Sequence, residues 1–161
     1  MNVTLKPIDR GNWREMLALE LAPEQQSFVT QPPLTFARCY VRLFGDNFEH
    51  TPMVICGGGR VVGYVTIACN PASERDYWID DIMIDRKDQS RGYGRAAMRE
   101  IVAYILARYP RCAGIRLTCF RTNKIAAALY TSLGFLPTGG LDEEHGEPDY
   151  ELSGPALAAF R

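Results

Sequence analysis

The sequence predicts an α/β fold in which a mixed, mostly antiparallel sheet of six to seven strands is flanked by helices. In the first half, two β-rich runs are separated by Gly57-Gly58-Gly59, which is typical of a hairpin between antiparallel strands. In the second half, strand-like and helical segments alternate, which favours partly parallel pairing. Pro7 lies in the first β-rich segment, residues 3–8, and predicts an edge strand because proline cannot donate a ladder hydrogen bond.

Local signals set the predicted elements in chain order. Asp9 can cap a helix from about residue 12 to 21, and Pro23 can open a short helix over 24–29 that Pro32 and Pro33 end. The later predicted elements are a helix at 35–44, strands at 53–56, 61–68 and 77–85, a helix at 94–108, a strand at 115–120, a helix at 123–133, and strands at 135–138 and 149–152.

Length and composition indicate one globular domain spanning residues 1–161, with 47% apolar residues. The chain has 18 basic and 19 acidic residues, so its net charge does not predict binding to nucleic acid or to an anionic membrane. No signal peptide stands at the N-terminus, and no apolar run approaches the ~20 residues of a membrane span, so we expect a cytoplasmic protein. The five cysteines lack metal-binding spacing and only two histidines occur, so we expect no metal site.

A glycine-bearing loop lies between a predicted strand and a predicted helix, with the sequence Gln89-Ser90-Arg91-Gly92-Tyr93-Gly94. Glycines let main-chain N–H groups turn toward a ligand, and a helix N-terminus adds unpaired N–H groups and a positive dipole end. Arg91 and Arg95 add positive charge. The loop therefore suits a pyrophosphate, although an ordinary strand-to-helix turn has the same pattern. It is neither of the usual nucleotide fingerprints.

The spacing Gln89-x-x-Gly92-x-Gly94 resembles the pyrophosphate-binding signature of the GNAT superfamily of acyl-CoA N-acyltransferases. A second segment, residues 123–135, resembles that superfamily's other cofactor segment: Asn123 opens a helix, Tyr130 follows two turns later, and Gly-Phe ends it. The resemblance implies a GNAT fold with two splayed central strands, and an N-acetyltransferase that uses acetyl-CoA.

In such folds the pantetheine arm lies between the splayed strands and the diphosphate rests on the loop amides. Asn123 would contact the arm, and Tyr130 would lie near the thioester sulfur. The residues that the resemblance implies for the cofactor are Ile82, Met83, Ile84, Gln89, Ser90, Arg91, Gly92, Tyr93, Gly94, Arg95, Asn123 and Tyr130.

Acetyl transfer to an amine needs a base, because an alkyl amine has a pKa of ~10.4 and is protonated at neutral pH. Asp80 is the predicted base, directly or through water, since Asp80-Asp81 resembles a Glu-Asp pair in spermidine/spermine acetyltransferases. Strand alternation sends the two aspartates to opposite faces unless a bulge resets it, and either could simply be solvated or salt-bridged. Tyr130 is the predicted general acid, and a main-chain N–H around Ile82 or Met83 would polarise the carbonyl.

Trp13 and the runs 23–29 and 78–85 also resemble bacterial spermine/spermidine-type acetyltransferases, so we expect a small-molecule amine as acceptor. Carboxylates hold ammonium groups and aromatic faces attract them. The predicted acceptor-binding residues are Glu24, Phe28, Trp78, Asp80 and Asp81, with Glu20 and Tyr40 as further candidates for the groove.

The acidic segment 142–149 either flanks the acceptor entrance or forms a solvated turn. A homodimer is compatible with the sequence. The alternatives that stay open are an acetyltransferase acting on an aminoglycoside, an amino acid or a peptide N-terminus, and an acyl-CoA-binding module without turnover.

Overall fold

The computed structural model describes residues 2–42, 44–142 and 146–161. Seven strands form one sheet in the order β1-β2-β3-β4-β5-β7-β6, and every neighbouring pair is antiparallel except β4 and β5. This confirms the predicted mixed, mostly antiparallel sheet, with β1 at the predicted edge. The strands are β1 (Val3–Pro7), β2 (Glu49–Gly57), β3 (Arg60–Cys69), β4 (Tyr77–Ile84), β5 (Gly114–Thr118), β6 (Leu136–Leu141) and β7 (Pro148–Ser153).

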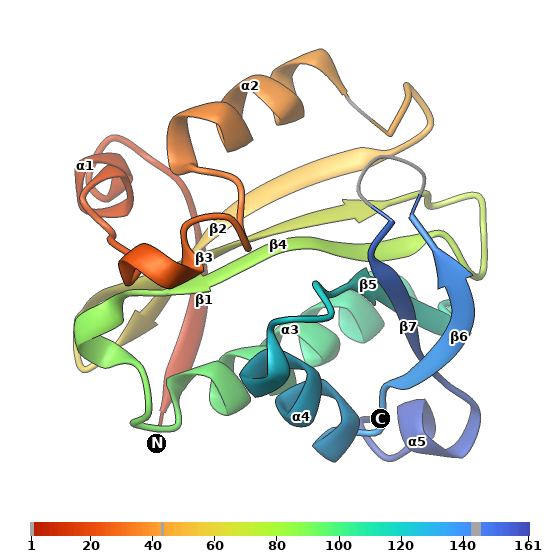
Figure 1. The fold of residues 1–161 in the computed structure, drawn as a ribbon. Helices are drawn as coiled ribbons and strands as arrows, with labels where there is room; N and C mark the ends of the chain where they lie inside the picture. The colour runs from red at the N-terminus through yellow and green to blue at the C-terminus, as the bar shows by residue number, and fades with distance from the viewer. Residues whose placement is uncertain (1, 43, 143–145) are drawn as a thin grey trace.

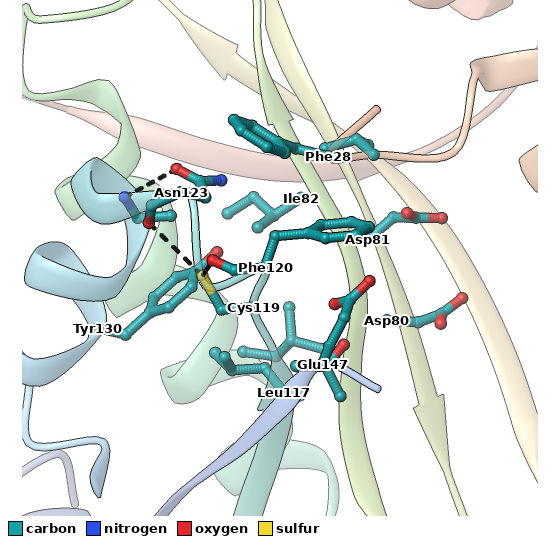
Figure 2. Close-up of a pocket in the computed structure, with 14 residues that line it drawn as sticks. Phe28, Asp80, Asp81, Ile82, Leu117, Cys119, Phe120, Asn123, Tyr130 and Glu147 are labelled. Atoms are coloured by element: carbon teal, nitrogen blue, oxygen red, sulfur yellow. Dashed lines mark hydrogen bonds between the residues drawn. The ribbon is translucent and has the colours of Figure 1, made fainter. Parts of the chain in front are cut away.

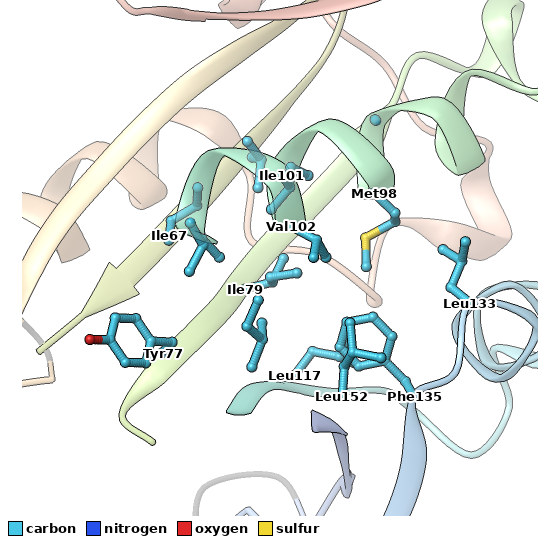
Figure 3. Packing of buried hydrophobic residues seen from close by; sticks show 14 of the residues in the cluster. Ile67, Tyr77, Ile79, Met98, Ile101, Val102, Leu117, Leu133, Phe135 and Leu152 are labelled. Carbon is cyan, nitrogen blue, oxygen red and sulfur yellow. The ribbon is translucent and has the colours of Figure 1, made fainter. Parts of the chain in front are cut away.

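Helices cover both faces of the sheet (Figure 1). On one face lie α1 (Trp13–Leu17) and α2 (Pro32–Val41). On the other lie α3 (Tyr93–Arg108), α4 (Lys124–Ser132) and α5 (Gly154–Ala158). The larger core forms between α3 and the sheet, where Met98, Ile101 and Val102 meet the inner strands (Figure 3). A smaller core around Met16, Tyr64 and Met83 lies on the α1 face.

The N-terminal helices differ from the prediction. The expected helix over 24–29 is only a 3₁₀ turn at Pro23–Gln25, and the next residues run as a loop whose contacts reach the sheet. Pro32 and Pro33 begin α2 instead of ending a helix, because proline is tolerated in the first turn, where its missing N–H has no intrahelical acceptor. The first helix is also shorter than predicted, and α5 was not predicted.

The predicted hairpin joins β2 to β3 through Gly58 and Gly59, with φ values of 61° and 82°. L-residues with side chains rarely adopt such φ values, so glycine at these positions permits the tight turn. The strands on either side are longer than predicted, and β2 includes Pro52.

Candidate active site

The two central strands separate along their length. Parallel pairing between β4 and β5 occurs at Trp78 and Arg116, and beyond that point a cavity of about 90 Å³ lies between the strands (Figure 2). The predicted splay is therefore present. The cavity is lined by Phe28, Val29, Ile79, Asp80, Asp81, Ile82, Leu117, Thr118, Cys119, Phe120, Asn123, Ala126, Tyr130 and Glu147.

Main-chain polar groups of β4 are available at this gap. The Asp85 N–H donates to the Val62 carbonyl of β3 at 2.9 Å. Because polar groups alternate along a strand, those of Met83 also face β3, and those of Ile82 and Ile84 face the gap. Of the two positions predicted to polarise a carbonyl, Ile82 is thus the one whose N–H is directed toward the cavity.

A β-bulge interrupts β4 at the aspartate pair. Thr66 pairs with Asp81 and Ile67 pairs with Ile79, so Asp80 is the extra residue of the bulge. The bulge resets the alternation, so the two carboxylates do not lie on opposite faces. Both point to the α2 side and away from Tyr130 (Figure 2).

The two aspartates have different surroundings. Asp80 is half-buried and its Oδ1 lies 3.3 Å from Nη2 of Arg38, a residue of α2 that the sequence analysis did not single out. Asp81 is buried and accepts hydrogen bonds from the Thr30 N–H at 3.1 Å and the Thr35 hydroxyl at 3.4 Å. Burial raises the pKa of the Asp81 carboxyl, against the lowering effect of these donors.

Tyr130 reaches the cavity from α4. Asn123 caps this helix, because its Oδ1 accepts from the Ala126 N–H at 3.2 Å. The Tyr130 side chain is 7% exposed, its ring is oriented toward Cys119, and it packs on Phe135 with ring centroids 6.1 Å apart (Figure 2). Burial raises the pKa of Tyr130 above its ordinary value, so the phenol keeps its proton at neutral pH.

Cys119 lies beside Tyr130 in the cavity wall and was not among the predicted site residues. Its thiol contacts the carbonyls of Phe120 and Asn123, each at 3.7 Å. Burial raises the pKa of this thiol to about 11, so it is protonated and not a nucleophile at neutral pH.

The predicted phosphate loop leads directly into α3. Gly92 is the N-cap with φ 86°, and Ser90 also has a positive φ of 60°. Within the part of the chain that the structure describes, the main-chain N–H groups of residues 90–95 have no protein acceptor. This conformation leaves a run of donors at a helix N-terminus, which fits the diphosphate of a coenzyme.

Side chains next to the loop brace it. Gln89 Nε2 donates to the Ile84 carbonyl at 3.0 Å, and its amide exchanges two hydrogen bonds with Gln25. Asp88 is fully buried and receives both guanidinium ends of Arg60 at 2.5 and 2.6 Å. Hydrogen bonding from Arg60 lowers the pKa of the Asp88 carboxyl. The Arg91 guanidinium lies 3.8 Å from Asp88.

The other predicted acceptor residues are not all brought to the cavity. Phe28 lines it and packs on Phe120 with centroids 5.7 Å apart. Glu24 is exposed on the 3₁₀ turn, and neither it nor Trp78 lines the cavity. The Trp78 ring instead has the Arg116 guanidinium 4.4 Å from its centroid.

Charge at the cavity is one-sided. Among the described residues that line it are the acidic residues Asp80, Asp81 and Glu147 and no lysine or arginine, although Arg38 lies behind the wall at 3.3 Å from Asp80. Glu147 comes from the acidic segment 142–149, whose residues 143–145 lie outside the described part of the chain. Glu147 at the end of this segment lines the cavity. The acidic composition of the segment had fitted either a position at the acceptor entrance or a solvated turn.

The described residues contain no cluster of three or more His, Cys, Asp or Glu side chains that could hold a metal ion. None of their helices is both long enough and apolar enough to span a membrane.

Comparison with known proteins agrees with this geometry. The model of the acetyltransferase (GNAT) family matches residues 13–135. The spermine/spermidine N(1)-acetyltransferase of Bacillus subtilis is 25% identical over 147 residues, which cover 88% of this chain and 93% of that protein.

Solved structures share the fold. Spermidine N-acetyltransferase from Vibrio cholerae, in complex with CoA and spermine, matches with a TM-score of 0.67 and 20% identity over 92% of each chain. The aminoglycoside acetyltransferase AAC(6')-Ib, in complex with coenzyme A, matches with a TM-score of 0.73 and 16% identity over 98% of each chain. The chain belongs to the acetyltransferase (GNAT) family and is an N-acetyltransferase with acetyl-CoA as its co-substrate.

Proposed function

We propose that this enzyme acetylates a primary amine of a small cationic molecule, a polyamine such as spermine or spermidine. One observation carries the proposal: the described lining of the cavity between the splayed strands combines Tyr130 with three acidic residues and no lysine or arginine. Carboxylates bind ammonium groups, and the aromatic face of Phe28 adds cation–π attraction of about 0.5–2 kcal/mol. An anionic acceptor would be repelled from the same space.

The chain's own residues hold the co-substrate in this scheme. Main-chain N–H groups of residues 90–95 bind the diphosphate, and Arg91 and Arg95 add positive charge beside it. The pantetheine arm lies beside β4 as an added strand would, hydrogen-bonded to the main-chain groups of Ile82 that face the gap and next to Asn123. The side chain of Gln89 keeps the loop in shape through Ile84 and Gln25. When bound, acetyl-CoA supplies an acyl thioester.

Acetyl transfer requires three catalytic roles from the protein: a base, a hydrogen-bond donor to the carbonyl oxygen, and an acid. Asp80 accepts a proton from the ammonium, directly or through water, so that a neutral amine can attack the thioester carbonyl. The Ile82 N–H stabilises the charge that develops on the carbonyl oxygen. As the new C–N bond forms and the C–S bond breaks, Tyr130 donates its phenolic proton to the leaving thiolate, and the proton that the acylated nitrogen loses restores the Tyr130 phenol.

The match to the Bacillus subtilis spermine/spermidine acetyltransferase, which covers 88% of this chain, supports the choice of a polyamine. The structure is also similar to an aminoglycoside acetyltransferase. An aminoglycoside is therefore included among the acceptors tested below, since the same acidic residues would attract this multivalent amine.

The test is a panel of acceptors with the purified chain and acetyl-CoA. CoA release is measured with spermine, spermidine, an aminoglycoside, free amino acids and a peptide, and mass spectrometry checks each amine for one added acetyl group. We expect the highest kcat/KM with spermine or spermidine. A higher kcat/KM with another amine would reassign the acceptor, and CoA release that no amine increases would refute the proposal.

A further inference from the structure

We propose that Asp81 is a positioning residue that acts on the acceptor through Thr30: it holds the cavity wall that carries Phe28, whereas the proposed function assigns proton transfer to Asp80. The inference rests on the proposed function, because it divides the work of two residues at that function's acceptor site. It starts from the loop that follows the 3₁₀ turn.

Thr30 is held by three elements at once. Its N–H donates to Asp81 Oδ1 of β4 at 3.1 Å, and its hydroxyl accepts from Arg38 Nη1 of α2 at 3.1 Å. Its carbonyl accepts from the Tyr64 hydroxyl of β3. The Thr35 hydroxyl of α2 also lies 3.5 Å from this carbonyl, so every polar group of Thr30 has a partner and the partners come from three elements, β3, β4 and α2. A loop residue bonded in this way has little freedom to shift.

Asp81 is committed to this arrangement. Oδ1 takes the Thr30 N–H, and Oδ2 takes the hydroxyl of Thr35, a residue that is 1% exposed. The Asp81 side chain itself is buried, at 8% exposure. Both of its oxygens therefore lie within hydrogen-bond reach of donors from the loop and α2, and a buried acceptor that loses its donor is destabilising. Asp80, one residue earlier, has its Oδ1 3.3 Å from Arg38 Nη2 of α2 and makes no contact with Thr30 that would hold the loop.

The position of Thr30 decides the position of Phe28. Phe28 lies two residues earlier, lines the cavity, and packs on Phe120 of the opposite wall. Two residues after Thr30, Pro32 begins α2, whose proline fixes the backbone at that end. The wall is thus clamped at Thr30 and Pro32, and releasing Thr30 would let Phe28 move and change the width of the cavity.

The decisive variants are Asp81→Asn and Asp81→Ala. Asparagine keeps an oxygen for the Thr30 N–H but has no charge, whereas alanine has neither. If Asp81 positions Thr30, Asp81→Ala raises the amine KM by about tenfold with a smaller change in kcat, and Asp81→Asn stays within about threefold of wild type. An Asp81→Asn variant as impaired in KM as Asp81→Ala would overturn the proposal, because the charge itself would then be needed.

Asp80→Asn is the matched comparison on the same bulge. It should lower kcat and displace the acidic limb of the pH profile of kcat, which Asp81→Asn should leave in place. A pH profile displaced by Asp81→Asn and not by Asp80→Asn would reverse the assignment.

A second readout does not depend on turnover. Amide hydrogen exchange of residues 26–31 should become faster in Asp81→Ala and remain near wild type in Asp81→Asn. If Asp81→Ala does not fold, Tyr64→Phe replaces it, since it removes only the hydroxyl that donates to the Thr30 carbonyl. Exchange unaltered in the folded variant would refute the clamp. A wild-type enzyme that acetylates no amine would instead refute the proposed function and leave the exchange result to decide the clamp.

Discussion

The coenzyme side and the acceptor side of the cavity are built in different ways. On the coenzyme side, the loop at residues 89–95 and the start of α4 are contiguous segments with strong local features, such as the positive φ of Gly92 and the Asn123 cap, and Gln25 is a distant brace of the loop. On the acceptor side, the contacts join residues far apart in the chain: Thr30 to Asp81 across 51 residues and Arg38 to Asp80 across 42. Because the two sides share few residues, we expect a substitution on one side to leave ligand binding on the other side largely unchanged.

Tyr130 lies where the two sides meet, and its loss should have the largest effect. Tyr130→Phe removes the proposed proton donor and keeps the ring, so we expect kcat to fall by roughly 10²-fold, within the range of general acid catalysis. Binding of acetyl-CoA, measured by calorimetry, should change little. Tyr40→Phe is the control, because Tyr40 is 89% exposed and does not line the cavity. An unaltered kcat in Tyr130→Phe would remove its role as acid.

Gly92→Val tests the coenzyme side alone. A β-branched residue at φ 86° is strained and its side chain obstructs the approach of the diphosphate to the amides, so we expect the Kd for acetyl-CoA to rise about tenfold. Gly59→Val introduces the same kind of strain at φ 82° in the β2–β3 hairpin, where a side chain would meet no neighbour. Equal affinity of Gly92→Val and Gly59→Val for acetyl-CoA would contradict the assignment of the loop.

Phe28→Ala tests the acceptor side alone. Losing one aromatic face should raise the KM for a polyamine by about fivefold, since a cation–π contact contributes about 0.5–2 kcal/mol. The Kd for acetyl-CoA should not change. Phe48→Ala serves as the control, because Phe48 lies outside this cavity. A change in coenzyme affinity instead of amine KM would show that the two sides are not separable.

Asp88 links stability to pH on the coenzyme side, and here we expect the smallest effect. Its pKa is lowered by Arg60, so the ionised form stabilises the fold fully above the unfolded value of ~3.9, and this contribution is lost as the pH falls through the lower folded value. Asp88→Asn should therefore be less stable than wild type in urea unfolding at pH 7, with the difference shrinking below about pH 4. Asp46→Asn, at a side chain that is 93% exposed, should show no such trend. A difference that is constant with pH would contradict the coupling.

Much of the sheet could be predicted from the sequence because its signals are local, and the coenzyme side stays a prediction that rests on equally local signals. Gly57 to Gly59 indicated the hairpin, Pro7 indicated the edge strand, and the two segments around Gly92 and Asn123 indicated where a coenzyme would lie. The helix over 24–29 was wrong for the converse reason. Its residues have helical propensity, but the contacts of Thr30 with the sheet override it.

The acceptor side could be predicted only in part. Phe28, Asp80 and Asp81 do line the cavity, while Glu24 and Trp78 do not. Arg38 carried no local signal, because an arginine on a helix is usually a solvated residue. Glu147 belonged to a segment whose composition fitted a turn equally well.

The sequence by itself determined the order of the strands, the positions of α3 and α4, and the turn residues before α3, since each depends on neighbours along the chain. Only the tertiary structure decided the direction of the two aspartates. A single bulged residue in β4 turns both carboxylates to the α2 side, and the bulge arises from pairing with β3 and packing against α2, which no window of sequence contains.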